Sequence, residues 1–314
     1  MAWGLLFGIF LKSLLSYIFF PLPGWPKFDL VQQRKLLSVA KHFAVIALGG
    51  LIMTQGDNLI ISMLTNSQQL GFYVMAYQLA VFPVLFLQDI ANRVALPLFS
   101  SLQGNKTRLR SVLTDVIQIQ LAIIIPFVIV TGVFSTEFIL TLYGDKWLES
   151  GVVLKFLMLV SLGKGLTHVC VPYILGTGAF SFASQMKLVE TLIFLVSVYV
   201  GTLYFGLTGA ALGAGTGYMV AGIGRLIFMC RDSGLSFVHI IKYALLPSLA
   251  VIPGVLTAIF LTNAVTWHRT VETGVIVLII CGGYAGFSFF VQRNLISLFS
   301  QYKKKNPVRM EALS

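Results

Sequence analysis

The residues best able to do chemistry in this sequence are polar and ionisable side chains inside long apolar runs. Residues 51–62 read LIMTQGDNLIIS, and apolar runs flank them on both sides. The combined stretch is long enough to cross a bilayer, yet Gln55, Asp57 and Asn58 lie well inside it. A carboxylate in hydrocarbon costs on the order of a few kcal/mol, so we expect these groups to meet water, a ligand or one another.

Two basic residues occur equally deep in a later apolar run. Lys164 and His168 are four residues apart, so on a helix they share one face. Together with Asp57 and Asn58 they lie too far from the ends of their runs to reach the headgroups. Intramembrane ionisable groups are candidates for function, and these four side chains are therefore candidates for a polar cavity.

Other charged residues in the apolar runs have simpler interpretations. Lys155 and Glu190 lie near the ends of their runs, where a side chain can extend to the headgroups. Lys12 interrupts the first run and would reach the headgroups only if that span is shifted. Asp89 and Arg93 are four residues apart, and we predict a structural ion pair between them.

The composition places most of the chain in lipid. Hydrophobic residues make up 57% of the 314 residues and charged residues 11%, with a mean hydropathy of +0.89. A soluble domain carries more than twice that charge. The net charge of +11 then indicates cytoplasmic loops and anionic lipid rather than nucleic acid. The three cysteines show no spacing typical of disulfides or metal sites.

Hydropathy predicts an all-α, polytopic integral membrane protein with about nine transmembrane helices. The predicted spans are residues 2–21, 41–64, 71–97, 112–135, 149–176, 186–206, 208–230, 241–263 and 272–292. Basic-rich and basic-poor connections alternate, which places segments 22–40, 98–111, 177–185 and 231–240 and the C-terminus in the cytoplasm. The first span would then start outside. With no signal peptide, this suggests missing upstream helices.

A stripe of small residues follows the predicted turn at Gly206. Gly209, Gly213, Gly217 and Ala221 recur every four residues, a spacing typical of a helix-packing face. The glycine spacing in GAGTG is also that of part of a phosphate loop, but no strand precedes it. Metalloprotease, P-loop and serine-hydrolase motifs are missing from the sequence, and the connections are short, so we predict neither an enzyme nor a cofactor or metal site.

Five sequence segments in this order resemble a known family. They are DNLIIS (57–62), LGFYVMAYQLA (70–80), NRVALPLFSSLQ (92–103), YGDKW (143–147) and GLTGAALG (206–213). Over residues 37–231 the chain resembles the second half of polysaccharide transport proteins, the O-antigen (Wzx-type) and exopolysaccharide flippases. These belong to the multidrug/oligosaccharidyl-lipid/polysaccharide exporter superfamily.

The resemblance implies the C-terminal bundle of a V-shaped transporter built from two bundles. Residues 1–36 would supply the last helix of an incomplete N-terminal bundle and a cytoplasmic amphipathic linker. Residues 37–234 would form the six-helix C-terminal bundle, and residues 235–314 two additional helices and a basic cytoplasmic tail. The chain would lie in the bacterial cytoplasmic (inner) membrane, with the missing bundle or a polysaccharide polymerase complex as partners.

The implied substrate is an undecaprenyl-pyrophosphate-linked oligosaccharide in contact with membrane lipids. Its pyrophosphate would favour cationic partners, and its sugars would favour amides. The cationic candidates are Lys12, Lys164 and His168, and the amide candidates are Gln55, Asn58 and Gln78. Asp57 and Glu190 are candidates for coupling to a cation or proton.

Three alternatives remain open on the sequence. The first is a cation-coupled small-solute or multidrug antiporter of the same superfamily, although Lys164 argues against it. The second is a membrane-embedded glycosyltransferase or polysaccharide polymerase, which would need a long catalytic loop. The third is a fragment without transport activity.

Overall fold

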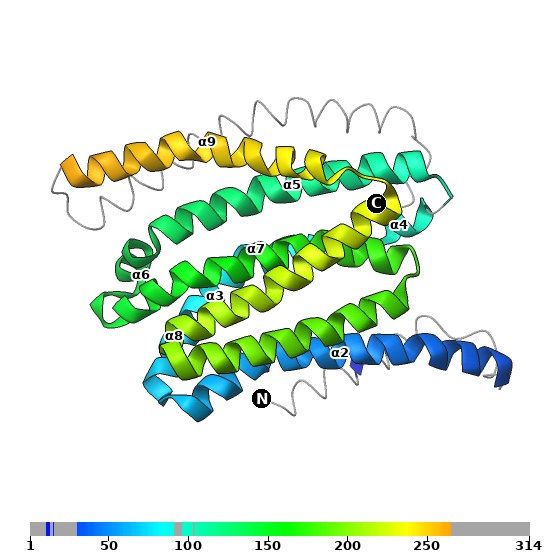
Figure 1. Cartoon of the computed structure of the whole chain (residues 1–314), viewed down its shortest axis with the longest axis horizontal. Coiled ribbons are helices and arrows are strands. Elements are labelled where there is room, and N and C mark those ends of the chain that lie inside the picture. The colour runs from blue at the N-terminus through cyan, green and yellow to red at the C-terminus, as the bar shows by residue number, and fades with distance from the viewer. Residues whose placement is uncertain (1–10, 13–14, 16–29, 91–95, 103, 265–314) are drawn as a thin grey trace. The chain divides into compact units, whose positions relative to one another are not determined.

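The computed structural model describes residues 11–12, 15, 30–90, 96–102 and 104–264, and every regular element within these ranges is a helix (Figure 1). The chain divides into two units, Met1–Lys41 and His42–Ser314. The second unit holds nearly all of the described core.

The helices follow one another through short connections. They are α2 (Leu30–Leu64), α3 (Ser67–Ile90), α4 (Leu96–Ser101), α5 (Lys106–Val133), α6 (Ser135–Tyr143), the 3-10 turn η2 (Asp145–Trp147), α7 (Leu148–Gly176), α8 (Phe180–Ser233) and α9 (Phe237–Ala264). Asn105 starts α5, because its side-chain oxygen accepts a hydrogen bond from the backbone N–H of Arg108. Gly234 ends α8 in the left-handed conformation, with φ of 72°.

Helix α8 is two helices joined at Gly206. A straight helix of its 54 residues would be about 80 Å long, far more than the roughly 30 Å of a bilayer core. At Gly206 the backbone leaves the helical region, with φ of 59° and ψ of −142°. The chain reverses there, and the first half (180–205) and second half (207–233) lie side by side (Figure 1). The turn at Gly206 was predicted from the sequence.

The small-residue stripe packs the two halves together, as predicted. A methyl group at Gly213 would lie 2.2 Å from the carbonyl oxygen of Ser197, and one at Gly217 would lie 2.8 Å from Cα of Phe194. Gly209 approaches the backbone of Gly201 just as closely. No larger side chain fits at these positions without separating the helices.

Helix α7 is the centre of the second unit. It packs against α3, α4, α5, α6 and α8, while α9 packs along α5 on the other side (Figure 1). Pro83, Pro126 and Pro172 lie within α3, α5 and α7, and these helices continue through them.

Five described helical stretches are long and apolar enough to cross a membrane. They are Leu36–Leu64, Lys106–Val133, Asp145–Gly176, Phe180–Ser233 and Ile240–Thr257. The all-α membrane fold is therefore confirmed. The number of nine spans stays a prediction, because segment 272–292 and most of segment 2–21 lie outside the described residues.

Candidate functional site

Asp57 is buried in the second unit and held by two hydrogen bonds. Only 1% of the residue is exposed. The hydroxyl of Tyr73 on α3 donates to one carboxylate oxygen at 2.9 Å, and the backbone N–H of Asn58 donates to the other at 2.9 Å. These donors replace the water that a carboxylate would lose in the membrane, which explains how the chain accommodates an aspartate at this depth.

Aromatic rings connect this region to Lys164. The ring of Tyr73 stacks on that of Tyr77, with 5.9 Å between centroids. Lys164 Nζ donates a hydrogen bond to the Tyr77 hydroxyl at 2.8 Å, and it lies 5.0 Å and 4.8 Å from the ring centroids of Tyr77 and Tyr218. We call Asp57, Tyr73, Tyr77, Lys164 and Tyr218 the aromatic–lysine cluster. It draws on α2, α3, α7 and the second half of α8.

A second buried cluster surrounds Glu190. Its carboxylate accepts from Arg225 Nη2 at 2.6 Å and pairs with Lys187 Nζ at 3.2 Å. Glu190 is 2% exposed and Arg225 3%. We call Lys187, Glu190 and Arg225 the Glu190 ion cluster. It joins the two halves of α8, and Lys187 Nζ also contacts Met53 Sδ on α2 at 3.2 Å.

The burial of Arg225 was not predicted from the sequence. The structure buries its guanidinium between helices, because the reversal at Gly206 brings it opposite Glu190. The two residues lie at similar sequence distances from Gly206, so pairing the halves of the hairpin could have revealed their contact.

His168 lies one turn from Lys164 on α7, as its spacing predicted. Its Nε2 atom is buried, and so is Nη1 of Arg225; neither has a hydrogen-bond partner among the described residues. A buried polar atom in this condition requires an explanation, which we develop below.

The predicted amides lie apart from the buried clusters. Gln55 and Gln78 are exposed and Asn58 is half-buried. Asn58 Nδ2 lies 3.5 Å from Gln55 Oε1, which keeps the two amides together on α2. Thr54 is also exposed. Helix α2 thus presents a polar face, formed by Thr54, Gln55 and Asn58, that the described residues cover only in part.

The structure leaves other predicted residues untested. Lys12 is exposed within the first unit. Arg93 and the Asp89 side chain lie outside the described residues, so their ion pair stays a prediction. Lys155 is exposed on α7.

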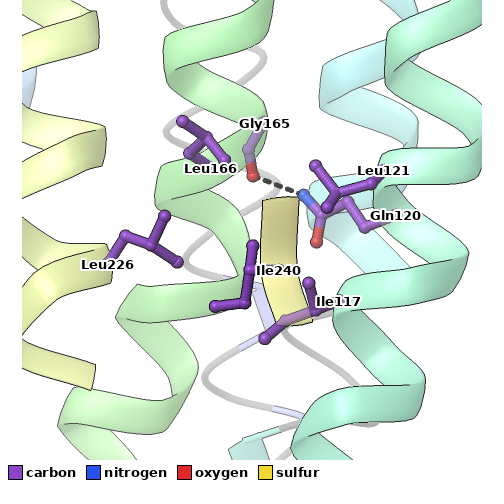
Figure 2. Close-up of a pocket in the computed structure, with 7 residues that line it drawn as sticks. All are labelled: Ile117, Gln120, Leu121, Gly165, Leu166, Leu226 and Ile240. Carbon is purple, nitrogen blue, oxygen red and sulfur yellow. Dashed lines mark hydrogen bonds between the residues drawn. The ribbon is translucent and has the colours of Figure 1, made fainter. Parts of the chain in front are cut away.

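A small pocket between α5, α7, α8 and α9 is too small for a substrate. Figure 2 shows its lining residues, Ile117, Gln120, Leu121, Gly165, Leu166, Leu226 and Ile240. Its volume of about 10 Å³ is close to the minimum for one water molecule. Gln120 Nε2 donates to the carbonyl oxygen of Gly165 at 2.6 Å across the pocket (Figure 2). This contact joins α5 to α7 and was not predicted. The part of the chain that the structure describes holds no group of three metal-ligating side chains.

Known proteins resemble both the sequence and the fold of this chain. Residues 1–152 match a family described as polysaccharide biosynthesis protein. The chain is 27% identical over 151 residues to teichuronic acid biosynthesis protein TuaB of Bacillus subtilis, covering 47% of this chain and 31% of TuaB. It is 24% identical over 160 residues to lipopolysaccharide biosynthesis protein WzxC of Escherichia coli, covering 51% of this chain and 32% of WzxC.

Among solved structures, lipid II flippase MurJ in an inward closed conformation matches with a TM-score of 0.66 and 17% identity. The match covers 90% of this chain and 59% of MurJ. The chain spans about a third of the length of the two curated relatives. The predicted resemblance to polysaccharide transport proteins is confirmed, and the chain is a multi-pass membrane protein.

Proposed function

Because the chain is related to polysaccharide biosynthesis proteins and shares the fold of a lipid II flippase, we propose that it forms the C-terminal bundle of a flippase. The flippase would translocate lipid-linked oligosaccharide across the cytoplasmic membrane for surface polysaccharide synthesis. Residues 37–234 would form the six-helix bundle, residues 1–36 would contribute to the other bundle, and residues 235–314 would add two helices and a basic tail.

The observation that carries this proposal is the polar face of α2. Thr54 and Gln55 are exposed, and Asn58 is half-buried, within residues 43–64 of α2, which are mostly apolar. An amide against lipid tails has no hydrogen-bond partner, whereas a water-filled cavity between two bundles would hydrate it. Gln78 on α3 is also exposed. These amides can both donate and accept, and they would bind sugar hydroxyls.

Lys164 is suited to an anionic group. An ammonium has three N–H donors, and the structure engages one of them with the Tyr77 hydroxyl. Its partners, two tyrosine rings and a hydroxyl, are uncharged. A pyrophosphate would compete well with such partners, and a point charge on a flexible stem can release it again. An undecaprenyl-pyrophosphate-linked oligosaccharide is therefore the proposed substrate, with Lys12 as a further cationic candidate. His168, whose Nε2 atom is buried, is not retained as one.

Asp57 is the better candidate for coupling to a proton or cation. Its carboxylate is buried and held by neutral donors, so its charge state can change without breaking an ion pair with a described residue. Glu190 already meets two cations, which favours a structural role for it. We further propose a location in the bacterial inner membrane with a cytoplasmic C-terminus. Membrane lipids, an N-terminal bundle and a polysaccharide polymerase complex would be the partners.

Variants of Lys164 test the proposal in reconstituted liposomes. The assay measures how fast a fluorescent undecaprenyl-pyrophosphate-linked oligosaccharide reaches the opposite leaflet, normalised to protein abundance. Lys164→Arg should retain part of the rate, whereas Lys164→Gln should lose about tenfold because a charge-assisted hydrogen bond disappears. Lys164→Glu should be slower still. Lys155→Gln changes an exposed lysine of the same helix and is the matched control. A wild-type rate for Lys164→Gln at wild-type abundance would refute the role of Lys164.

A further inference from the structure

Two buried nitrogen atoms between α7 and the second half of α8 have no hydrogen-bond partner among the described residues. They are Nε2 of His168 and Nη1 of Arg225. Arg225 is 3% exposed, and its other terminal nitrogen, Nη2, is already bonded to Glu190. Buried polar atoms rarely stay unsatisfied, so each points to something that it binds.

The two residues lie at the same level of the fold. Helix α7 and the second half of α8 run parallel: Gly163 adjoins the backbone of Tyr218, and ten residues further along α7 the Tyr173 hydroxyl donates to Asp232 at 2.7 Å. In the sequence, His168 lies midway between Gly163 and Tyr173 on α7. Arg225 lies midway between Tyr218 and Asp232 on α8. The two residues therefore lie at the same level on neighbouring helices, which is the condition for one ligand to bind both side chains.

The charge balance of the surrounding residues indicates the sign of that ligand. Lys164, Lys187 and Arg225 all act electrostatically on His168. The carboxylates in the two buried clusters are Asp57 and Glu190, so three positive charges face two negative ones. A net positive charge in a membrane-embedded interior is costly unless an anion balances it. A water molecule would satisfy the hydrogen bonds but would leave the net positive charge unbalanced.

We propose that the bundle binds a small monovalent anion, with the size and charge of chloride, between Nη1 of Arg225 and Nε2 of His168. The near-complete burial of Arg225 excludes a lipid-linked pyrophosphate from this position. His168 would carry its proton on Nε2 and act as a neutral donor. The anion would neutralise the Glu190 ion cluster and tie α7 to α8. This site does not depend on the proposed transport function, because Arg225 and the Glu190 ion cluster are not part of the proposed substrate site.

Thermal unfolding of the detergent-purified protein tests the site. A thiol-reactive dye reports unfolding when it reaches Cys170, which is fully buried in the fold. Unfolding is compared in sodium chloride and sodium gluconate at equal ionic strength, since gluconate is too large for the site. Chloride should raise the midpoint by about 2–4 °C, because a ligand that binds only the folded state stabilises it. Bromide should act like chloride, and bromide-soaked crystals should show an anomalous peak next to both nitrogen atoms.

Variants separate a bound anion from a general salt effect. Arg225→Lys keeps the positive charge opposite Glu190 but lacks the second terminal nitrogen, and it should lose the chloride-specific shift. His168→Leu should lose it as well, whereas His168→Gln retains an amide donor and should keep it. Lys155→Gln, at an exposed position of α7, should also keep it.

Three results would overturn the proposal. The first is an equal midpoint in chloride and gluconate, which would leave a water molecule as the ligand. The second is a shift of the same size in all variants, and the third is a bromide peak elsewhere. If Arg225→Lys does not fold, the two His168 variants and the wild-type comparison still decide the question.

Discussion

Replacing Glu190 by glutamine should destabilise the fold strongly. The substitution keeps the shape of the side chain but removes the charge that balances Arg225 at 2.6 Å and Lys187 at 3.2 Å. Removing one partner of a buried ion pair costs about 3–5 kcal/mol, because the other charge stays buried without compensation. At roughly 2–4 °C per kcal/mol for a domain of this size, the unfolding midpoint should fall by about 6–20 °C.

The measurement is thermal unfolding in detergent, followed by the reactivity of buried Cys170. Glu149→Gln is the matched control: Glu149 is exposed at the start of α7, so its loss should change the stability by no more than about 0.5 kcal/mol. The double variant Glu190→Gln/Arg225→Gln should be more stable than the sum of the two single losses predicts, since no unpaired guanidinium remains. If the unfolding midpoints of Glu190→Gln and Glu149→Gln differ by less than about 2 °C, the buried ion pair does not stabilise the fold and the reasoning fails.

Two further predictions address the packing and the topology. Gly213→Ala should lower the free energy of unfolding by about 1–3 kcal/mol, because the added methyl group would lie 2.2 Å from a backbone oxygen. Gly50→Ala is the control, since no atom lies within 4 Å of the added carbon. Equal stability of the two variants would contradict the close packing at Gly213. Cysteine at Gln68, an exposed residue in the first turn of α3, should react with an impermeant maleimide in intact cells. Cysteine at Lys106 should react only after permeabilisation, and external labelling at position 106 would refute the predicted orientation.

The sequence predicted the features that depend on local spacing. The turn at Gly206 and the packing face of Gly209, Gly213 and Gly217 were predicted correctly, because a glycine-rich, four-residue period has few other uses in a membrane helix. The depth of Asp57 was predictable, since an aspartate in the middle of an apolar run cannot reach the headgroups, but its burial against the Tyr73 hydroxyl was not.

The partners of these residues were not predictable in the same way. Tyr73, Tyr77 and Tyr218 look like ordinary core residues in an apolar run, and only the packing of α3 and α8 against α7 places their polar atoms. The burial of Arg225 could not be predicted from the distribution of basic residues, which indicates the sidedness of a loop and carries no information on contacts between helices.

The two buried clusters differ in how easily they could rearrange. Glu190 is bound by two opposite charges, so moving it would leave uncompensated charges inside the bundle. Lys164 is bound by a neutral hydroxyl and two aromatic rings, and cation–π contacts are much weaker than a buried ion pair. An anionic headgroup could therefore draw Lys164 away from Tyr77 and Tyr218 without disturbing the helices. On this argument the Glu190 ion cluster keeps the two halves of α8 together as a rigid body. Changes that accompany substrate binding would be confined to the aromatic–lysine cluster and the polar face of α2.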